Sequence, residues 1–196
     1  MAGSGRVVAG IAGGIQLAAA GPGTRPLADR VKQAIFGSLD PFLPGAAVLD
    51  LCAGSGAAAI EALSRGAARA VLVERDAGAV AVIRENLRRT GLAAAATVVR
   101  RDAAAALRDP ALRSDRFDLA IVDPPYSETG LRDALLALLG APDGPLRAGA
   151  TVVVTAYWRA PPPEEVGLLR STRVRRFGET AITIYRRDPG GVAVAD

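Results

Sequence analysis

Apolar runs and amphipathic stretches alternate along most of the chain. The apolar runs predict strands over residues 46–51, 69–73, 95–100, 117–122 and 150–155. Between them, apolar residues recur at helical spacing, for example over residues 57–65 and 76–89. Strands that alternate with helices are typical of an α/β fold with a doubly wound, mostly parallel sheet.

The N-terminal region carries a different pattern. Residues 6–9 and 15–17 predict a small hairpin around Gly13-Gly14. The stretch "RPLADRVKQAIFGSL" that follows predicts an amphipathic helix, with Arg30 and Lys32 away from its buried side. Prolines and a glycine then break the chain, so we expect a separate N-terminal extension over residues 1–44.

A second hairpin is predicted near the C-terminus. The segments "TRVRRF" and "TAITIYRR" flank Gly178-Glu179, a two-residue loop with glycine first. This hairpin would add an antiparallel edge to the parallel strands and bring the sheet to about seven strands. The length of 196 residues suits one main domain, expected over residues 45–187, and residues 188–196 are expected to fray.

The composition excludes several kinds of catalysis. The chain has no histidine, so Ser-His-Asp and Cys-His nucleophile systems are excluded, and we expect no metal site. The chemistry must then come from carboxylates or from a cofactor. The net charge is +4, and Lys32 is the single lysine among 24 basic residues. A cationic, arginine-rich chain is compatible with nucleic-acid binding.

The sequence also indicates where the protein works. Its single cysteine allows no internal disulfide, which suits a reducing cytoplasm. The N-terminal apolar residues resemble a signal peptide, but glycines and Gln16 interrupt them, so we expect no export. No apolar run has the length and purity of a membrane span.

The loop after the first predicted strand has the pattern of a cofactor-binding turn. In "VLDLCAGSGAAAIEAL" the chain passes from a buried strand through Gly54-Ser55-Gly56 into a helix, so bare backbone can approach a ligand beside the helix N-terminus. Twenty residues after Gly54, Glu74 ends the next strand, where a carboxylate can accept hydrogen bonds from both ribose hydroxyls. The loop and Glu74 together predict an adenosine cofactor.

Asp50 helps to choose between two such cofactors. Residues 54–59 also fit a G-x-G-x-x-A dinucleotide fingerprint, which leaves a nicotinamide-dependent oxidoreductase as an alternative. A carboxylate at Asp50 would repel a pyrophosphate but could orient the ammonium of an amino-acid tail, which favours S-adenosylmethionine. Asp102 follows the third strand and is placed either to accept from the adenine amine or to cap a helix. Cys52 is interpreted as a small packed thiol rather than a nucleophile.

The stretch "FDLAIVDPPYSE" delivers Asp123-Pro124-Pro125-Tyr126 to the tip of the fourth strand. Aspartate and proline favour strand exits by themselves, so a simple turn is one interpretation. In a doubly wound sheet, however, this tip should lie beside the glycine loop. Asp123 and the Pro124 carbonyl could then accept hydrogen bonds from an exocyclic amine and aim its lone pair at a methyl donor, while Tyr126 stacks on the flipped base. Cytosine-C5 methylation is disfavoured, because Pro125 stands where its cysteine nucleophile would be expected.

Four blocks of the sequence resemble, in the right order, the signatures of the RsmD family of bacterial methyltransferases, which methylate guanine N2 in 16S ribosomal RNA. They are "GTRPLADRVKQAIF", "VLDLCAGSGAAAIEALSRGA", "DLAIVDPPY" and "FGETAITIY". The resemblance runs from about Arg6 to Tyr185, and its first and last blocks are more specific than the central ones. The first hairpin departs from the family, because no cation lies between Arg6 and Arg25.

The resemblance implies a Rossmann-like class I S-adenosylmethionine-dependent methyltransferase, a cytoplasmic monomer acting on ribosomal RNA within a small-subunit assembly intermediate. It implies cofactor binding by Asp50, Ala53, Gly54, Ser55, Gly56, Glu74, Asp102 and Ala103. Catalysis is expected at Asp123, Pro124, Pro125 and Tyr126. RNA contacts are expected from the extension, at Arg6, Arg25, Arg30 and Lys32.

Charge supports an RNA substrate without deciding it. Residues 1–44 hold four basic against two acidic residues, and residues 159–187 hold seven against three. Cationic flanks around a nearly neutral centre suit phosphate contacts on either side of an extruded base. A DNA adenine-N6 or cytosine-N4 methyltransferase could use the same Asp-Pro-Pro-Tyr motif, and a non-catalytic RNA-binding protein could keep the same fold.

Overall fold

The elements follow the predicted alternation of strands and helices. The computed structural model describes residues 5–21 and 29–189, and the chain divides into two units, Met1–Ala103 and Ala104–Asp196. The first unit contains α1 (Asp29–Leu39), the 3-10 helix η1 (Asp40–Phe42), β1 (Ala47–Leu51), α2 (Ala57–Ser64), β2 (Arg69–Glu74), α3 (Ala77–Thr90), the 3-10 helix η2 (Ala93–Ala95) and β3 (Ala96–Arg100). From the boundary onward follow α4 (Ala103–Leu107), α5 (Pro110–Ser114), β4 (Phe117–Val122), α6 (Thr129–Leu139), β5 (Leu146–Tyr157), β6 (Glu165–Val166), β7 (Leu169–Phe177) and β8 (Thr180–Arg187).

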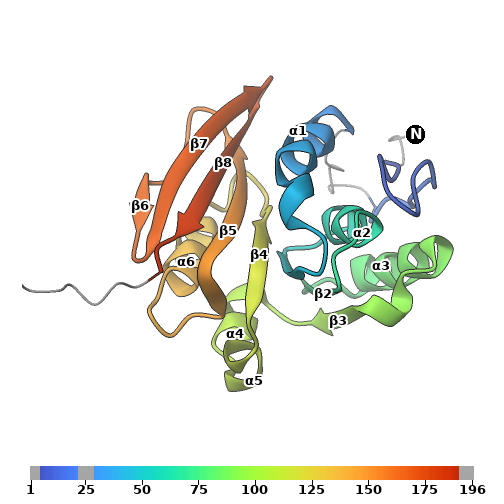
Figure 1. The fold of residues 1–196 in the computed structure, drawn as a ribbon, viewed down its shortest axis with the longest axis horizontal. Helices are drawn as coiled ribbons and strands as arrows, with labels where there is room; N and C mark the ends of the chain where they lie inside the picture. The colour runs from blue at the N-terminus through green and yellow to red at the C-terminus, as the bar shows by residue number, and fades with distance from the viewer. Residues whose placement is uncertain (1–4, 22–28, 190–196) are drawn as a thin grey trace, which may run out of the picture. The chain divides into compact units, whose positions relative to one another are not determined.

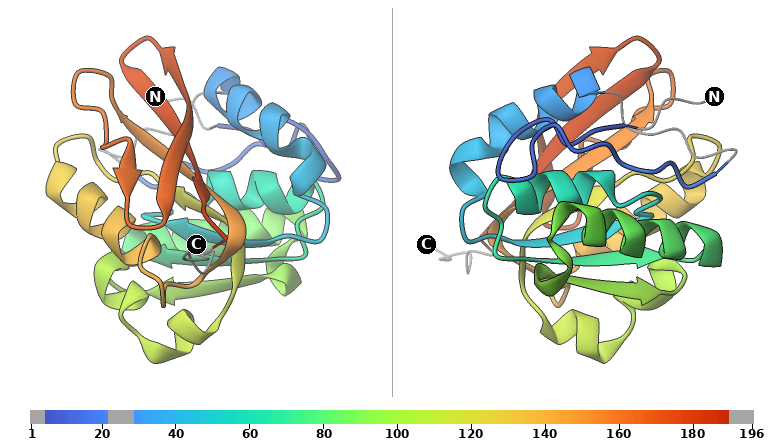
Figure 2. Two further views of the ribbon diagram at one scale, coloured as in Figure 1. Left: turned by 60° about the vertical axis from the view of Figure 1, so that its left-hand side comes forward. Right: turned by 90° about the vertical axis from the view of Figure 1, so that its right-hand side faces the viewer.

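The strands of the first unit are parallel and stand in the order β3-β2-β1. Every residue of β1 is buried, as expected for a strand covered on both faces. Helices α2 and α3 lie over the same face of these strands (Figure 2). The register pairs Asp50 with Leu72 and Glu74 with Arg100, so the carboxyl ends of the three strands are level.

In the second unit the strand order is β4-β5-β8-β7-β6. Strands β4 and β5 are parallel, whereas β8, β7 and β6 are each antiparallel to the preceding strand in that order. The long strands β5, β8 and β7 run side by side in Figure 1. The predicted C-terminal hairpin is therefore confirmed. The two-residue strand β6, too short for a sequence pattern, brings the strands of the described residues to eight rather than seven.

The N-terminal segment, residues 5–21, forms less regular structure than predicted. A single antiparallel bridge joins Arg6 to Gln16 in place of two paired strands. Val7 and Leu17 are nonetheless buried, each about 1% exposed. The segment belongs to the first unit, together with the strands and helices up to β3. No helix in the described part of the chain is long and apolar enough to cross a membrane.

Candidate active site

The loop between β1 and α2 has an unusual backbone. Cys52, Gly54 and Gly56 have φ angles of 63°, 56° and 76°, all in the left-handed region. Cys52 is the one non-glycine residue with positive φ among those that the structure describes, and it is half-buried. A side chain in this conformation costs on the order of 1–2 kcal/mol. Such backbone strain is concentrated at functional sites, so the conformation of Cys52 supports a ligand-binding function for this loop.

The two glycines of the loop have different roles. A Cβ atom at Gly54 would meet nothing within 4 Å, so this backbone is open to a ligand. A Cβ atom at Gly56 would lie 3.1 Å from Leu72 and 3.4 Å from Ile83, so this glycine lets α2 pack closely against β2 and α3. The division of roles matches a nucleotide-binding turn.

Glu74 is joined to the loop by a hydrogen bond. Its Oε2 accepts a hydrogen bond from the Gly54 amide at 2.8 Å, and its Oε1 accepts one from the Asp76 amide at 2.9 Å. These bonds fix the carboxylate beside the open backbone of Gly54. Each oxygen has two lone pairs, so the capacity to accept from two ribose hydroxyls remains.

Asp50 occupies the start of α2. Its Oδ2 accepts a hydrogen bond from the amide of Ala59, the third residue of the helix, at 3.1 Å, and the residue is 2% exposed. A helix N-terminus of this kind is where dinucleotide-binding folds hold a pyrophosphate. Because a buried carboxylate takes that position, the loop is unsuited to phosphates, which argues against a nicotinamide cofactor.

Asp102 lies beyond the end of β3. The amide of Arg101 donates to the Glu74 carbonyl at 3.0 Å, which carries the chain past the tip of β2. Asp102 is exposed and immediately precedes α4, whose first residue, Ala103, is buried. Its position therefore allows both interpretations, an adenine contact and a helix cap.

Sequence reasoning missed Asn86, a fully buried residue of α3. Its Nδ2 donates to the carbonyls of Ser55 at 2.9 Å and Ala18 at 3.0 Å, and its Oδ1 accepts from the Ala18 amide at 2.7 Å. One side chain thus ties the N-terminal segment to the glycine loop. An asparagine on the buried face of an amphipathic helix is the signal that could have found it.

In the second unit, the Asp123 carboxyl group accepts a hydrogen bond from the hydroxyl of Thr155 on β5. Burial raises the pKa of Asp123 to about 6, and this hydrogen bond opposes the rise. Thr155 itself is 1% exposed. A carboxyl group with this pKa is ionised at neutral pH but close to its titration, which is typical of functional positions.

Tyr126 is anchored by the C-terminal hairpin. Its hydroxyl lies 2.6 Å from the Thr180 hydroxyl at the start of β8. The motif also forms a turn, because the Pro125 carbonyl accepts from the Glu128 amide at 2.8 Å. The turn and the site interpretations are therefore compatible. The structure brings Asp123 and Tyr126 together with two threonines from neighbouring antiparallel strands.

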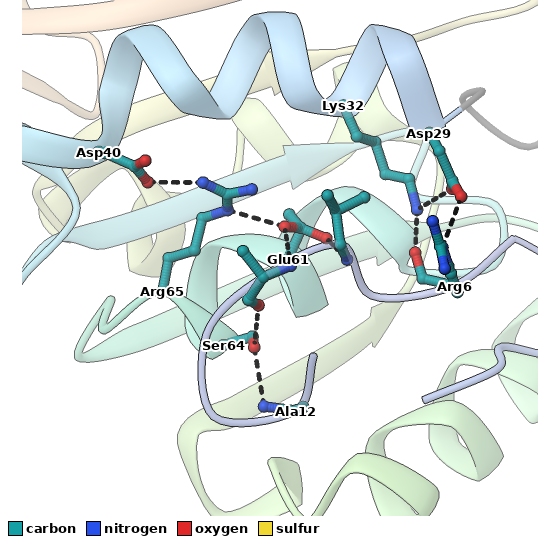
Figure 3. A network of polar contacts seen from close by, with 10 residues as sticks. Arg6, Ala12, Asp29, Lys32, Asp40, Glu61, Ser64 and Arg65 are labelled. Atoms are coloured by element: carbon teal, nitrogen blue, oxygen red, sulfur yellow. Dashed lines mark hydrogen bonds and ion pairs between the residues drawn. The ribbon is translucent and has the colours of Figure 1, made fainter. Parts of the chain in front are cut away.

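The residues predicted to contact RNA have different surroundings. Arg30 is exposed on α1, and Arg6 is about half exposed and pairs with Asp29 at 2.9 Å. Lys32 is fully buried, because its ammonium bonds to the Arg6 carbonyl and pairs with Asp29 at 3.2 Å (Figure 3). We therefore remove Lys32 from the expected RNA contacts. Arg25 lies outside the described residues.

Glu61 of α2 holds the N-terminal segment at a second point. Its carboxylate is fully buried and accepts from the amides of Val8 at 2.7 Å and Ala9 at 3.1 Å. It also accepts from Arg65 Nε at 2.7 Å, and Arg65 reaches Asp40 at 2.7 Å (Figure 3). The segment is thus attached to α2 through a buried charged network as well as to α3 through Asn86.

Comparisons with known proteins agree with these features. The model of the family "Conserved hypothetical protein 95" matches residues 5–186. YlbH of Bacillus subtilis is 39% identical over 183 residues, covering 93% of this chain and 98% of YlbH. Ribosomal RNA small subunit methyltransferase D of Escherichia coli is 34% identical over 175 residues, covering 89% of this chain and 85% of that protein.

Solved structures show the same fold. The yhhF protein of Escherichia coli matches with a TM-score of 0.84 at 31% identity, covering 95% of this chain and 99% of that one. An RNA methyltransferase from Salinibacter ruber, in complex with S-adenosyl-L-homocysteine, matches with a TM-score of 0.60 at 18% identity, covering 90% and 99%, and this likeness concerns the fold alone. The α/β methyltransferase fold class is therefore confirmed. The chain belongs to the Conserved hypothetical protein 95 family, the RsmD family that its four sequence blocks resemble.

Proposed function

We propose that the protein transfers a methyl group from S-adenosylmethionine to the exocyclic N2 amine of a guanine in 16S ribosomal RNA. The observation that carries the proposal is the half-buried carboxyl group of Asp123, held by Thr155 inside an Asp-Pro-Pro-Tyr motif. The similarity to Ribosomal RNA small subunit methyltransferase D supports ribosomal RNA as the substrate class.

The first unit has the features that a nucleoside with an amino-acid tail needs. Gly54 leaves room for the ligand, and Glu74 is fixed where it can accept from the ribose. Asp50 can attract the ammonium of the tail, and Asp102 can accept from the adenine amine. When bound, S-adenosylmethionine supplies a methyl group on a positively charged sulfur. Asp50 and Glu74 both favour this cation over a phosphate-bearing dinucleotide.

The second unit has the groups that would activate the amine. Asp123 and the Pro124 carbonyl accept hydrogen bonds from the guanine NH2, which localises the nitrogen lone pair. As the new N–C bond forms and the S–C bond breaks, the nitrogen loses a proton, and a carboxylate whose pKa is about 6 can receive it. Tyr126, anchored to Thr180, offers a ring for stacking on the flipped base, a contact worth about 1–3 kcal/mol.

Three further features are part of the proposal. Arg6, Arg25 and Arg30 contribute RNA contacts from the N-terminal region. The protein acts in the cytoplasm, which suits its single cysteine. It acts as a monomer on a small-subunit assembly intermediate.

Methyl transfer from tritium-labelled S-adenosylmethionine tests the proposal. The acceptors are 16S ribosomal RNA and small-subunit intermediates prepared without the modification, with duplex DNA in parallel, and the products are separated as nucleosides. We expect N2-methylguanosine from RNA. Labelled N6-methyladenine or N4-methylcytosine from DNA, with RNA inert, would instead assign the protein to the DNA class.

Two matched variants, one directly after β4 and one near its start, connect the activity to the motif. Asp123→Ala should lower transfer by about a hundredfold or more, because it removes a group that positions the amine. Asp118→Ala, at the other end of the same strand, removes a carboxylate paired with Arg147 at 2.6 Å and should keep wild-type activity. Near-normal transfer by folded Asp123→Ala protein would reduce the motif to a turn.

A further inference from the structure

Strand β7 carries an exposed row of positive charge. Its nine residues, LRSTRVRRF, include four arginines and no acidic residue, and residues 172–176 are all exposed. Arg170 pairs with Glu165 at 2.5 Å. Within residues 5–21 and 29–189, the guanidinium groups of Arg173 and Arg175 have neither an ion-pair nor a hydrogen-bond partner. Strand β6 pairs only with Leu169 and Arg170 of β7, so among the described strands the rest of β7 is an open edge. Charged side chains on an open edge discourage aggregation, which is the simplest explanation of these arginines.

The strand register adds a second observation, because it separates these arginines by face. Arg175 pairs with Ile182 of β8, which pairs with Thr155 of β5. Residues that are paired across a sheet, and residues two apart along a strand, share a face. Arg173 and Arg175 therefore lie on the face that carries Thr155 and Thr180.

That face belongs to the candidate active site. Thr155 donates to Asp123, and Thr180 bonds to Tyr126. Two strand spacings place β7 roughly 10 Å from β5, so Arg175 is close to the motif on the scale of a nucleotide strand.

The opposite face has another role. Arg187, which shares that face with Tyr185, donates to the carbonyl of Ala141 just after α6, at 3.1 Å. Arg176 also lies on that side and packs over the ring of Trp158, with its guanidinium carbon 3.6 Å from the ring centroid. Arg176 and Arg187 thus make their contacts on the opposite face, whereas Arg173 and Arg175 lie on the face of the motif.

We infer that Arg173 and Arg175 bind the phosphates of the RNA strand next to the nucleotide held at Asp123 and Tyr126. The inference rests on the proposed function and assigns part of its substrate contacts to β7. The planar guanidinium group suits bidentate phosphate binding, and two unpaired guanidinium groups on one strand suit successive phosphates. The basic residues of β7 would also replace RNA contacts missing from the first predicted hairpin, which has no cation between Arg6 and Arg25.

The test compares two charge-matched double variants. Arg173→Gln with Arg175→Gln removes the proposed contacts. Arg147→Gln with Arg170→Gln removes two arginines of the same unit that pair with Asp118 and Glu165. Binding to a 16S ribosomal RNA fragment is measured against salt concentration, and methyl transfer is measured with varied RNA. Thermal melting verifies the fold, which substitutions at exposed positions should preserve.

We expect only the first pair to weaken RNA binding. Loss of two phosphate contacts should raise the Kd about ten- to thirtyfold at 0.15 M salt and reduce the salt slope by roughly 1.4 to 1.8. The KM for RNA should rise with it, while kcat at saturating RNA and the Kd for S-adenosylmethionine should stay at wild-type values.

Equal losses in both pairs would show a general effect of net charge and would overturn the inference, as would an unchanged Kd and salt slope. Failure of the proposed function is a separate result, namely a wild-type protein that methylates no RNA. Because binding is measured apart from transfer, it tests the two arginines in either case.

Discussion

Replacement of Glu61 by alanine should detach the N-terminal segment and destabilise the protein. The wild-type carboxylate is fully buried and accepts three hydrogen bonds of 2.7–3.1 Å, from Val8, Ala9 and Arg65. Hydrogen bonds to a charged group contribute about 1.5–3 kcal/mol each, and removal of one partner from a buried ion pair costs about 3–5 kcal/mol. Since these terms overlap, we expect a total loss of about 3–5 kcal/mol.

Two measurements separate global from local effects. Urea unfolding followed by circular dichroism reports the free energy of unfolding of the whole chain. Amide hydrogen exchange at Val8 and Ala9 reports the opening of the segment itself. If the segment detaches before the rest unfolds, the loss in the free energy of unfolding cannot exceed the free energy with which the segment packs on the first unit. Exchange at the amides of Val8 and Ala9 then becomes fast.

Glu85→Ala is the matched control. Glu85 is also a helical glutamate of the first unit, and it bonds to Arg88 at 2.9 Å and Arg89 at 2.7 Å, but at the surface. Both substitutions place alanine in a helix, so the change in helix propensity is shared. Exposed ion pairs contribute little, so this variant should unfold like the wild type. Wild-type unfolding and wild-type protection of Val8 and Ala9 in Glu61→Ala would refute the assigned role of the network.

Three further outcomes can be measured. Because burial raises the pKa of Asp123 to about 6, kcat/KM should fall as the pH drops below about 6. The same raised pKa makes protonated Asp123 stabilise the folded protein, so the free energy of unfolding should carry this contribution in full below about pH 4 and lose it by about pH 6. Asp123→Asn should lack this pH dependence. Glu74→Ala should weaken S-adenosylmethionine binding by on the order of 1.5–3 kcal/mol, and unchanged affinity in calorimetry would place the ribose elsewhere. Asn86→Ala should cost about 1–3 kcal/mol in urea unfolding and loosen the cofactor loop, detectable as faster exchange at Ala18 and a higher Kd for the cofactor.

The sequence alone determined the features that depend on the pattern of residues close together in the chain. Apolar runs, separated by stretches with apolar residues at helical spacing, located β1 to β5 within a few residues. The reason is that burial makes apolar residues recur along a strand or helix with the period of that element. The glycine-first loop at Gly178 placed the C-terminal hairpin. The pattern of Gly54 and Glu74 predicted a shared ligand. In the structure the two residues lie within hydrogen-bond distance, because parallel strands joined by a helix bring their carboxyl ends to one edge.

Only the tertiary structure decided which polar side chains face inward. Lys32 and Glu61 are of residue types usually found at the surface, yet both are fully buried. The N-terminal segment packs over them and supplies backbone hydrogen-bond partners that are distant in the sequence. Asn86 and Thr155 also bond to residues that are distant in the sequence. Asn86 bonds to Ala18, 68 residues away, and Thr155 bonds to Asp123, 32 residues away. Periodicity records which face is buried, but a polar residue can occupy that face only where distant groups satisfy its hydrogen bonds, and local sequence does not specify those groups.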